Sequence, residues 1–316
     1  MSDLKLFKLN NDKVEELTAV SFTLEKPLQT LIEHNLEEIF GITFLATEYS
    51  TGKNHRGRID TLGIDEDNCP VIIEYKRSES ENVINQGLFY LDWLMDHKAA
   101  FELLVMKKLG KDYVEEIEWS SPRLLCIAND FKKYDEHAVK QINRNIELIR
   151  YRKFNEGMLL FELVNSQTAT GHVQTDNRKK NTTHKTFGET DHKRRNRGQK
   201  TFRECLEQAS PGLTDLYHSI EDFILGLGDD VQAIELKHYK AYKIIKNFVC
   251  LEIKPQARHI LLYLKLDPKK ENLEDASIRD VSNIGHYGTG DLELKILTTD
   301  DFEKRKDLII KSYGMS

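Results

Sequence analysis

A polar and basic stretch at residues 166–200 constrains the architecture of this chain more than any other feature. It consists largely of Thr, Asn, Gln, Gly and basic residues, with almost no apolar side chain and no hydrophobic periodicity. Such a segment buries too little apolar surface to order itself, so we expect a basic flexible linker. The linker separates a domain at 1–165 from a domain at 201–316, and each is long enough to bury its own core.

Charge is distributed unevenly between this linker and the rest of the chain. Residues 166–200 hold nine basic and three acidic residues, a net +6, so the remainder of a chain with net charge −6 carries −12. A basic segment attached to an acidic body can contact phosphate groups locally.

Composition argues against several classes of protein. No stretch approaches the roughly 20 consecutive apolar residues of a membrane helix, and the first residues lack the apolar run of a secretory signal. The four cysteines are far apart and lack C-x-x-C spacing. We therefore expect a cytoplasmic protein with reduced thiols and no membrane partner.

Hydrophobic periodicity predicts an α/β domain in the first half. Apolar residues recur at helical spacing over 27–40, with Pro27 in the first turn and Gly41 after the last. Extended segments are expected at 42–49, 57–65, 70–77, 121–130 and 158–164, and further helices at 81–106 and 135–154. The turn DEDNCP joins the second and third extended segments into a hairpin. This order predicts a mixed α/β sandwich around one central sheet.

The second half is expected to be a small α+β domain. Helices are predicted within 201–227 and 300–313, and strands at 248–255, 259–266 and 292–298. The glycine-containing segment NIGHYGTGDLEL (283–294) is interpreted as a loop before a strand, because no Lys-Ser/Thr pair follows its glycines. His286 and Tyr287 in that loop could touch a ligand. The segment KHYKAYKIIKNF (237–248) mixes basic and aromatic residues as some nucleic-acid-binding surfaces do, but we interpret it as an ordinary helix.

Three charged residues in the first half form the pattern that carries chemistry. Asp60 lies near the start of one expected strand, and Glu74 and Lys76 lie on the next. Residues two apart on a strand point to the same face, so Glu74 and Lys76 project together, and the hairpin brings them beside Asp60. They follow the apolar run 71–73, which predicts a strand buried on both faces. Ionised groups are rarely placed on such a strand without a role, which weighs against a simple surface ion pair.

This trio suits the hydrolysis of phosphodiester bonds. Two carboxylates can hold Mg²⁺ or Mn²⁺ through oxygen ligands. The metal lowers the pKa of a bound water and stabilises charge on the phosphate oxygens. The ammonium of Lys76 can orient or polarise the attacking water, or neutralise the transition state.

The pattern RID–x13–E–x–K resembles the PD-(D/E)xK nuclease superfamily, in a form similar to mismatch- and branch-acting NucS-type endonucleases. The resemblance covers residues of about 25–165 and implies a restriction-endonuclease-like fold with a divalent metal as cofactor. One departure is Ile59, which stands where the full pattern has Pro. The second half resembles a domain of unknown function that is often fused to such nucleases, in proteins labelled predicted transport proteins.

The resemblance also implies roles for further residues. Gln86 and Tyr90 match a Gln-x-x-x-Tyr pair that follows the lysine strand, and both lie on one face of a helix. The family's additional acidic ligand is assigned to Glu33, with Glu37 and Glu48 as alternatives. We therefore expect the catalytic residues to be Asp60, Glu74, Lys76, Gln86 and Glu33. The expected metal ligands are Asp60, Glu74 and Glu33, and the expected nucleic-acid contacts are Tyr90, Arg58 and Arg77.

The sequence therefore predicts a metal-dependent DNA endonuclease, with RNA left open as a substrate and repair or defence against foreign DNA as its role. Cutting both strands needs two sites, so a homodimer is compatible with this function. The alternatives are a nucleic-acid-binding module without turnover and a regulatory scaffold in which the second domain is the active part.

Overall fold

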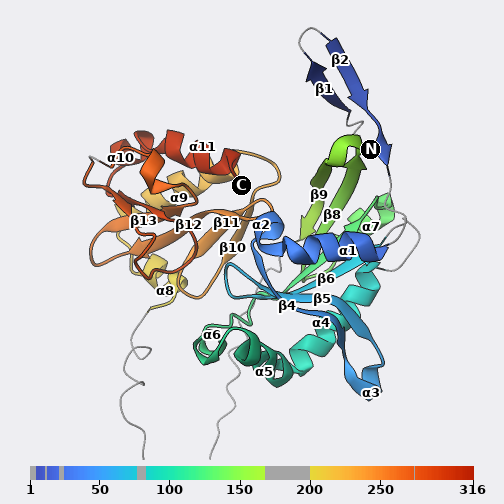
Figure 1. Cartoon of the computed structure of the whole chain (residues 1–316). Helices are drawn as coiled ribbons and strands as arrows, with labels where there is room; N and C mark the ends of the chain where they lie inside the picture. The colour runs from blue at the N-terminus through green and yellow to red at the C-terminus, as the bar shows by residue number, and fades with distance from the viewer. Residues whose placement is uncertain (1–4, 11–12, 21–24, 77–82, 168–199, 274) are drawn as a thin grey trace, which may run out of the picture. The chain divides into compact units, whose positions relative to one another are not determined.

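The computed structural model describes residues 5–10, 13–20, 25–76, 83–167, 200–273 and 275–316. The chain divides into two compact units, with β1 to β9 in the first and α8 to α11 in the second (Figure 1). Most of the expected linker, residues 168–199, lies outside the described residues. The domain boundaries at 165 and 201 therefore stay predictions.

The first unit is a mixed α/β structure. Its strands are β1 (Leu6–Asn10), β2 (Lys13–Leu17), β3 (Ala19–Val20), β4 (Ile42–Ser50), β5 (Arg58–Asp65), β6 (Pro70–Lys76), β7 (Arg123–Ala128), β8 (Asn145–Phe154) and β9 (Leu159–Gln167). Its helices are α1 (Glu25–His34), α2 (Leu36–Phe40), α3 (Gly52–His55), α4 (Val83–Asp96), α5 (Lys98–Lys108), α6 (Lys111–Glu115) and α7 (Lys133–Val139).

One sheet in the order β3-β8-β7-β6-β5-β4 forms the centre of this unit, with β9 paired to β8. Strands β4, β5 and β6 are antiparallel neighbours, whereas β6, β7 and β8 run parallel. The short turn at 65–70 allows the antiparallel β5–β6 hairpin, and the helices between β6 and β7 provide the longer crossover that a parallel pair requires.

The central strands are buried on both faces, as the apolar run 71–73 predicted. Val71, Ile73 and Tyr75 pack beneath α1 and α2 in one core cluster. Ile72 packs with α4 and α5 in the cluster on the opposite face. Figure 1 shows α1 and α4 on opposite sides of the sheet. This arrangement confirms the expected fold class in its architecture, a mixed-sheet α/β sandwich followed by a smaller α+β unit.

The expected helix at 135–154 is wrong beyond its first turns. Only α7 is helical there, and residues 145–154 form β8, which is paired on both sides. Val139, Ile142, Ile146 and Ile149 recur at helical spacing, which suggested one helix. The burial of β8 between β7 and β9 overrides that local pattern, because a strand buried on both faces does not need to alternate.

The N-terminal residues form strands that the sequence did not indicate. Strands β1 and β2 pair as a separate antiparallel ribbon, and β3 joins the edge of β8. Phe7, Leu9 and Val14 on the ribbon are exposed, so no hydrophobic alternation toward a core marked these strands.

Among the described residues, the second unit combines an antiparallel sheet with four α-helices. Its strands are β10 (Gln232–Glu235), β11 (Lys240–Lys243), β12 (Asn247–Lys254), β13 (His259–Leu264), β14 (Ile278–Asp280) and β15 (Leu292–Ile296), in the order β10-β11-β12-β13-β15-β14. Its helices are α8 (Phe202–Glu207), α9 (Pro211–Leu225), α10 (Thr299–Glu303) and α11 (Lys306–Gly314). The helix expected at 237–248 is wrong, because those residues contain β11 and the start of β12.

All four cysteines are free, and three of them are buried. Across the part of the chain that the structure describes, no helix combines the length and the apolar character needed to cross a membrane.

Candidate functional site

The β5–β6 hairpin brings Asp60 and Glu74 together, as the sequence predicted. The register pairs Thr61 with Ile73, so Asp60 and Glu74 lie opposite each other at the next position along the two strands. The Asp60 N–H donates to Glu74 Oε1 at 3.2 Å, and the Tyr75 N–H donates to Asp60 Oδ2 at 3.1 Å. Each carboxylate is therefore held by a backbone N–H of the other strand.

The two carboxyl groups lie in an environment that resists their ionisation. Glu74 is 0% exposed, and burial followed by the charge of Asp60 raises the pKa of Glu74 to about 9. Burial also raises the pKa of Asp60. Among the described buried side chains, Glu74 Oε2 is one of the few polar atoms without a hydrogen-bond partner. A buried carboxylate oxygen without a donor, beside a second carboxylate, favours a cation at this position.

Lys76 lies on the same face of β6 as Glu74 and is 17% exposed at its side chain. Its ammonium lowers the pKa of both Asp60 and Glu74 through its charge, although burial outweighs that effect. Its Nζ lies 4.0 Å from Oε2 of Glu25, the first residue of α1. Lys76 therefore shares a strand face with Glu74, and its charge acts on both carboxyl groups.

Glu48 is the alternative acid whose charge reaches the pair. It lies on β4 with φ of +51°, in the left-handed region that a non-glycine residue rarely adopts. Its charge raises the pKa of Asp60 and of Glu74. Burial raises the pKa of Glu48 itself, but Lys26 and Arg58 outweigh burial and leave that pKa below its ordinary value. Backbone strain of this kind is often found at functional sites.

Glu33, our first choice for the additional acid, contacts a different set of groups. Its Oε1 accepts a hydrogen bond from Thr61 Oγ1 at 2.6 Å and another from Gln29 Nε2 at 2.9 Å. Thr61 neighbours Asp60 on β5, so its side chain points to the opposite face of the sheet. Glu37 is exposed on α2. The ligand roles of Glu33 and Glu37 stay predictions, and the charges acting on Asp60 favour Glu48.

Gln29 was not identified from the sequence, although it contacts more of the site than Glu33 does. It is 4% exposed, and its Nε2 lies within hydrogen-bond distance of Asp60 O at 2.8 Å, Glu33 Oε1 and Thr47 Oγ1. Its spacing of one helical turn before Glu33 was the available signal, because residues four apart share a helix face.

Gln86 and Tyr90 lie together on α4, as their spacing predicted. Gln86 Nε2 donates to the Tyr90 hydroxyl at 3.4 Å, and the Arg58 N–H donates to the same hydroxyl at 3.2 Å. Tyr90 is 6% exposed, so its ring supports the start of β5. Its role as a nucleic-acid contact stays a prediction, and the burial of the ring speaks against it.

Of the two arginines predicted to contact nucleic acid, the structure describes only Arg58. The Arg58 side chain is 68% exposed, and its Nε lies 2.8 Å from Glu48 Oε2. Its side chain is therefore open to solvent, and its contact with nucleic acid stays a prediction. Arg77 lies outside the described residues.

The donor set of the site fits a hard divalent cation. Carboxylate oxygens are the ligands that Mg²⁺ and Mn²⁺ prefer, and Mg²⁺ is commonly held by one or two carboxylates with several waters retained. The unpartnered oxygen of Glu74 supports this assignment. No group of three or more His, Cys, Asp or Glu residues within the described ranges lies close enough to hold a metal by itself. Asp60 and Glu74 would therefore hold such an ion with water and substrate oxygens completing the shell.

Comparisons with known proteins cover both units. Residues 203–316 match the model of a domain of unknown function, DUF5655. An uncharacterized protein of Haemophilus influenzae is 28% identical over 314 residues, which is 97% of this chain and 98% of that protein.

Two solved structures show weaker likeness. A repair endonuclease from Pyrococcus abyssi has a TM-score of 0.27 and 18% identity over 42% of this chain and 49% of its own. A structure titled as a complex of EndoMS with double-stranded DNA has a TM-score of 0.24 and 15% identity over 46% of this chain and 64% of its own. The chain thus spans about half to two thirds of these two proteins.

Proposed function

We propose that the first unit is a divalent-metal-dependent endonuclease that hydrolyses phosphodiester bonds in DNA. The observation that carries this proposal is the buried pair of Asp60 and Glu74, with an unpartnered Glu74 oxygen and the Lys76 ammonium on the same strand face. A purely structural cluster would satisfy its buried polar atoms, whereas Glu74 Oε2 has no hydrogen-bond partner and lies beside a second carboxylate.

Each residue has a distinct task in the proposed reaction. Asp60 and Glu74 would hold Mg²⁺ or Mn²⁺, which when bound supplies Lewis-acid stabilisation of charge on the phosphate. Lys76 orients the attacking water and offsets negative charge that develops on the phosphate oxygens. Gln29 fixes Asp60 through its backbone carbonyl, because a buried amide with several partners holds one rotamer.

Glu48 is the acid that we favour as a supplementary ligand or water-orienting group. In the free protein it is paired with Lys26 Nζ at 3.0 Å and with Arg58 Nε at 2.8 Å. Both cations are more than half exposed, so a phosphate backbone can compete for them when substrate binds. Binding of DNA would thereby free Glu48 to face the carboxylate pair.

DNA is favoured as the substrate by the family resemblance of residues 25–165, and the exposed Arg58 and the basic stretch at 166–200 suit a phosphate backbone. Two copies would cut both strands of a duplex, so a homodimer fits the proposal. Repair and defence against foreign DNA both fit such an activity.

Cleavage of a substrate panel tests the proposal. The panel contains single-stranded, duplex, mismatched and branched DNA, together with RNA, each with Mg²⁺, Mn²⁺ or a chelator. The expected result is metal-dependent cutting of at least one DNA that is lost in Lys76→Ala. Lys107→Ala, which removes an exposed lysine from α5, is the matched control and should cut at the wild-type rate.

The competing function is nucleic-acid binding or regulation without turnover. Folded, metal-saturated protein that binds a member of the panel and cuts none would favour that alternative. Cutting that persists in Lys76→Ala would point to a contaminating nuclease or to another site.

A further inference from the structure

The sheet of the second unit has one face that carries polar and charged side chains. Cys250, Glu252 and Lys254 share this face because they alternate along β12. The register places Tyr263 beside Cys250 and His259 beside Lys254 on β13, and Glu293 beside Tyr263 on β15. The intervening residues of β12 and β13 are apolar and buried, so they form the face that belongs to the core.

A cavity of about 280 Å³ lies against this polar face. It brings together side chains from the start of the unit, from the segment before β11, from β12 and from the loop before β15. Its lining includes Lys200, Cys205, His238, Glu252, Lys254 and Tyr287. The two sequence segments set aside above, KHYK and GHYGTG, therefore meet at one hollow.

Two aromatic rings make one wall of this cavity. The rings of His238 and Tyr287 are stacked, with centroids 4.6 Å apart and planes at 27°. His238 Nδ1 lies 3.0 Å from the carbonyl oxygen of Lys200 and can donate a hydrogen bond to it, which fixes the orientation of the imidazole. A planar heterocycle can extend a stacked pair of this kind.

The loop that carries Tyr287 is fixed to the sheet. His286 stacks on Tyr263 with centroids 4.2 Å apart, and the Thr289 N–H donates to Cys250 Sγ at 3.3 Å. Gly290 has φ of +133°, and a Cβ there would lie 2.8 Å from the backbone of Leu264. Gly290 therefore serves the close approach of this loop to β13, and Tyr287 is held in place before any ligand arrives.

Charged groups complete the lining of the cavity. The ammonium of Lys254 pairs with the carboxylate of Glu252, which is 3% exposed, and Lys200 adds a second ammonium. Lysine is a common ligand of phosphate, whereas a buried carboxylate can accept hydrogen bonds from an exocyclic amino group.

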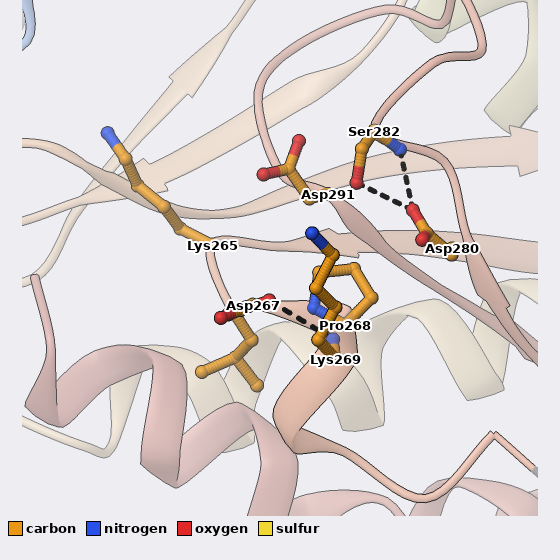
Figure 2. Close-up of a pocket in the computed structure, with 8 residues that line it drawn as sticks. Lys265, Asp267, Pro268, Lys269, Asp280, Ser282 and Asp291 are labelled. Carbon is orange, nitrogen blue, oxygen red and sulfur yellow. Dashed lines mark hydrogen bonds between the residues drawn. The ribbon is translucent and has the colours of Figure 1, made fainter.

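A second hollow in the same unit lacks this combination. Figure 2 shows that cavity, of about 350 Å³, with Asp267, Asp280 and Asp291 among its lining and no aromatic ring. Asp280 already accepts two hydrogen bonds from Ser282, and Asp267 accepts one from the Lys269 N–H. The site in Figure 2 therefore offers no surface on which a base could stack.

We propose that the cavity lined by Tyr287, His238 and Lys254 binds a nucleotide, with the base against the aromatic rings and the phosphate at the two lysines. Its volume suits a single nucleotide unit rather than a longer segment. The ligand is a free mononucleotide or one unit of a single strand, since both present the same base and phosphate. The proposal stands on the second unit alone and does not depend on nuclease activity in the first.

Cys205 supplies a local readout of occupancy. It lines the cavity and is half-buried, whereas Cys69, Cys126 and Cys250 are buried. The full-length protein is treated with a thiol reagent in a chelator, which prevents metal-dependent cleavage. The rate of Cys205 modification is then measured against the concentration of adenosine monophosphate, adenosine, inorganic phosphate or an eight-nucleotide single-stranded DNA, with calorimetry in parallel.

The expected result is saturable protection of Cys205 by the monophosphate, at least tenfold tighter than by adenosine or phosphate alone. Tyr287→Leu and Lys254→Gln should each weaken protection about tenfold, and Lys265→Gln, which alters the cavity of Figure 2, should leave it unchanged. Tighter protection by the oligonucleotide identifies a strand as the ligand, and tighter protection by the monophosphate identifies a free nucleotide.

Three results would overturn the proposal. They are an unchanged rate of Cys205 modification with every probe, equal protection by phosphate and by the nucleotide, and unaltered nucleotide binding in both pocket variants. Because Lys254→Gln changes a half-buried side chain, it keeps the test decisive if Tyr287→Leu fails to fold.

Discussion

Replacing Glu74 with Gln should remove a large part of the pH dependence of stability in the metal-free protein. Burial, and next the charge of Asp60, raise the pKa of Glu74 to about 9 from an ordinary value of 4.5. The folded state therefore binds this proton more tightly than the unfolded chain does. The stability that this proton contributes is fully present below pH 4.5 and is lost as the pH rises through 9.

The size of the effect follows from the width of this window. Each pH unit inside it changes the free energy of unfolding by about 1.4 kcal/mol for one such group. Between about pH 5.5 and about pH 8 the wild-type protein can therefore lose at most about 3 kcal/mol of unfolding free energy through this group. Relaxation around the charged carboxylate reduces the expected loss to about 1–2 kcal/mol. Gln keeps an acceptor for the Asp60 N–H but does not titrate. Any change in stability caused by the amide itself is the same at both pH values, so it cancels when the two measurements are subtracted.

Urea unfolding in a chelator measures this difference. The two tryptophans of the chain, Trp93 and Trp119, both pack in the core of the first unit, so their fluorescence follows that unit alone. Wild type should lose about 1–2 kcal/mol relative to Glu74→Gln as the pH is raised over this range. A difference between the two proteins that stays constant with pH would refute the reasoning.

Mn²⁺ should stabilise the wild-type protein against unfolding but not Glu74→Gln. Mn²⁺ at about one hundred times its Kd stabilises the folded state by about 2.7 kcal/mol through mass action. Glu74→Gln should lose this stabilisation, and Glu37→Gln, which alters an exposed glutamate on α2, should keep it. Equal stabilisation of both variants would place the metal elsewhere.

Three further substitutions have expected outcomes. Gln29→Leu should slow single-turnover cleavage about tenfold, because Asp60 loses the donor to its carbonyl, and urea unfolding should show a loss of about 1–3 kcal/mol. Arg123→Met should lower the free energy of unfolding by about 3–5 kcal/mol in the same assay, because the buried carboxylates of Asp65 and Glu147 lose the charge of the guanidinium. Gly290→Ala should cost about 1–3 kcal/mol in the second unit, measured by circular dichroism, because its positive φ and the adjacent backbone exclude a Cβ. Full stability in either of the last two variants would contradict the stated contacts.

The sequence predicted the elements whose patterns are local. The β5–β6 hairpin carries turn residues between two apolar runs, and the resulting antiparallel register brings Asp60 opposite Glu74. Helix α9 begins at Pro211, directly after the capping residue Ser210, and continues with apolar residues at helical spacing. These features are decided by neighbouring residues and do not require knowledge of the rest of the chain.

Other features depend on distant partners and could not be read locally. Strand β8 has helical spacing in sequence and becomes a strand only because β7 and β9 pair with it. The preference for Glu48 over Glu33 arises from the path of β4 and the face on which Thr61 points. The helical spacing places Gln29 on the face of Glu33, but Gln29 reaches Asp60 only because α1 packs over β5.

Measuring Mn²⁺ affinity and single-turnover cleavage in the same three variants tests the central claim most directly. If Asp60 and Glu74 hold the metal and Lys76 acts on the reacting groups, Asp60→Asn and Glu74→Gln lose both affinity and cleavage. Lys76→Ala then keeps the Mn²⁺ affinity and loses cleavage by about a hundredfold or more. Wild-type cleavage in Lys76→Ala, or undiminished Mn²⁺ affinity in both carboxamide variants, would contradict the account.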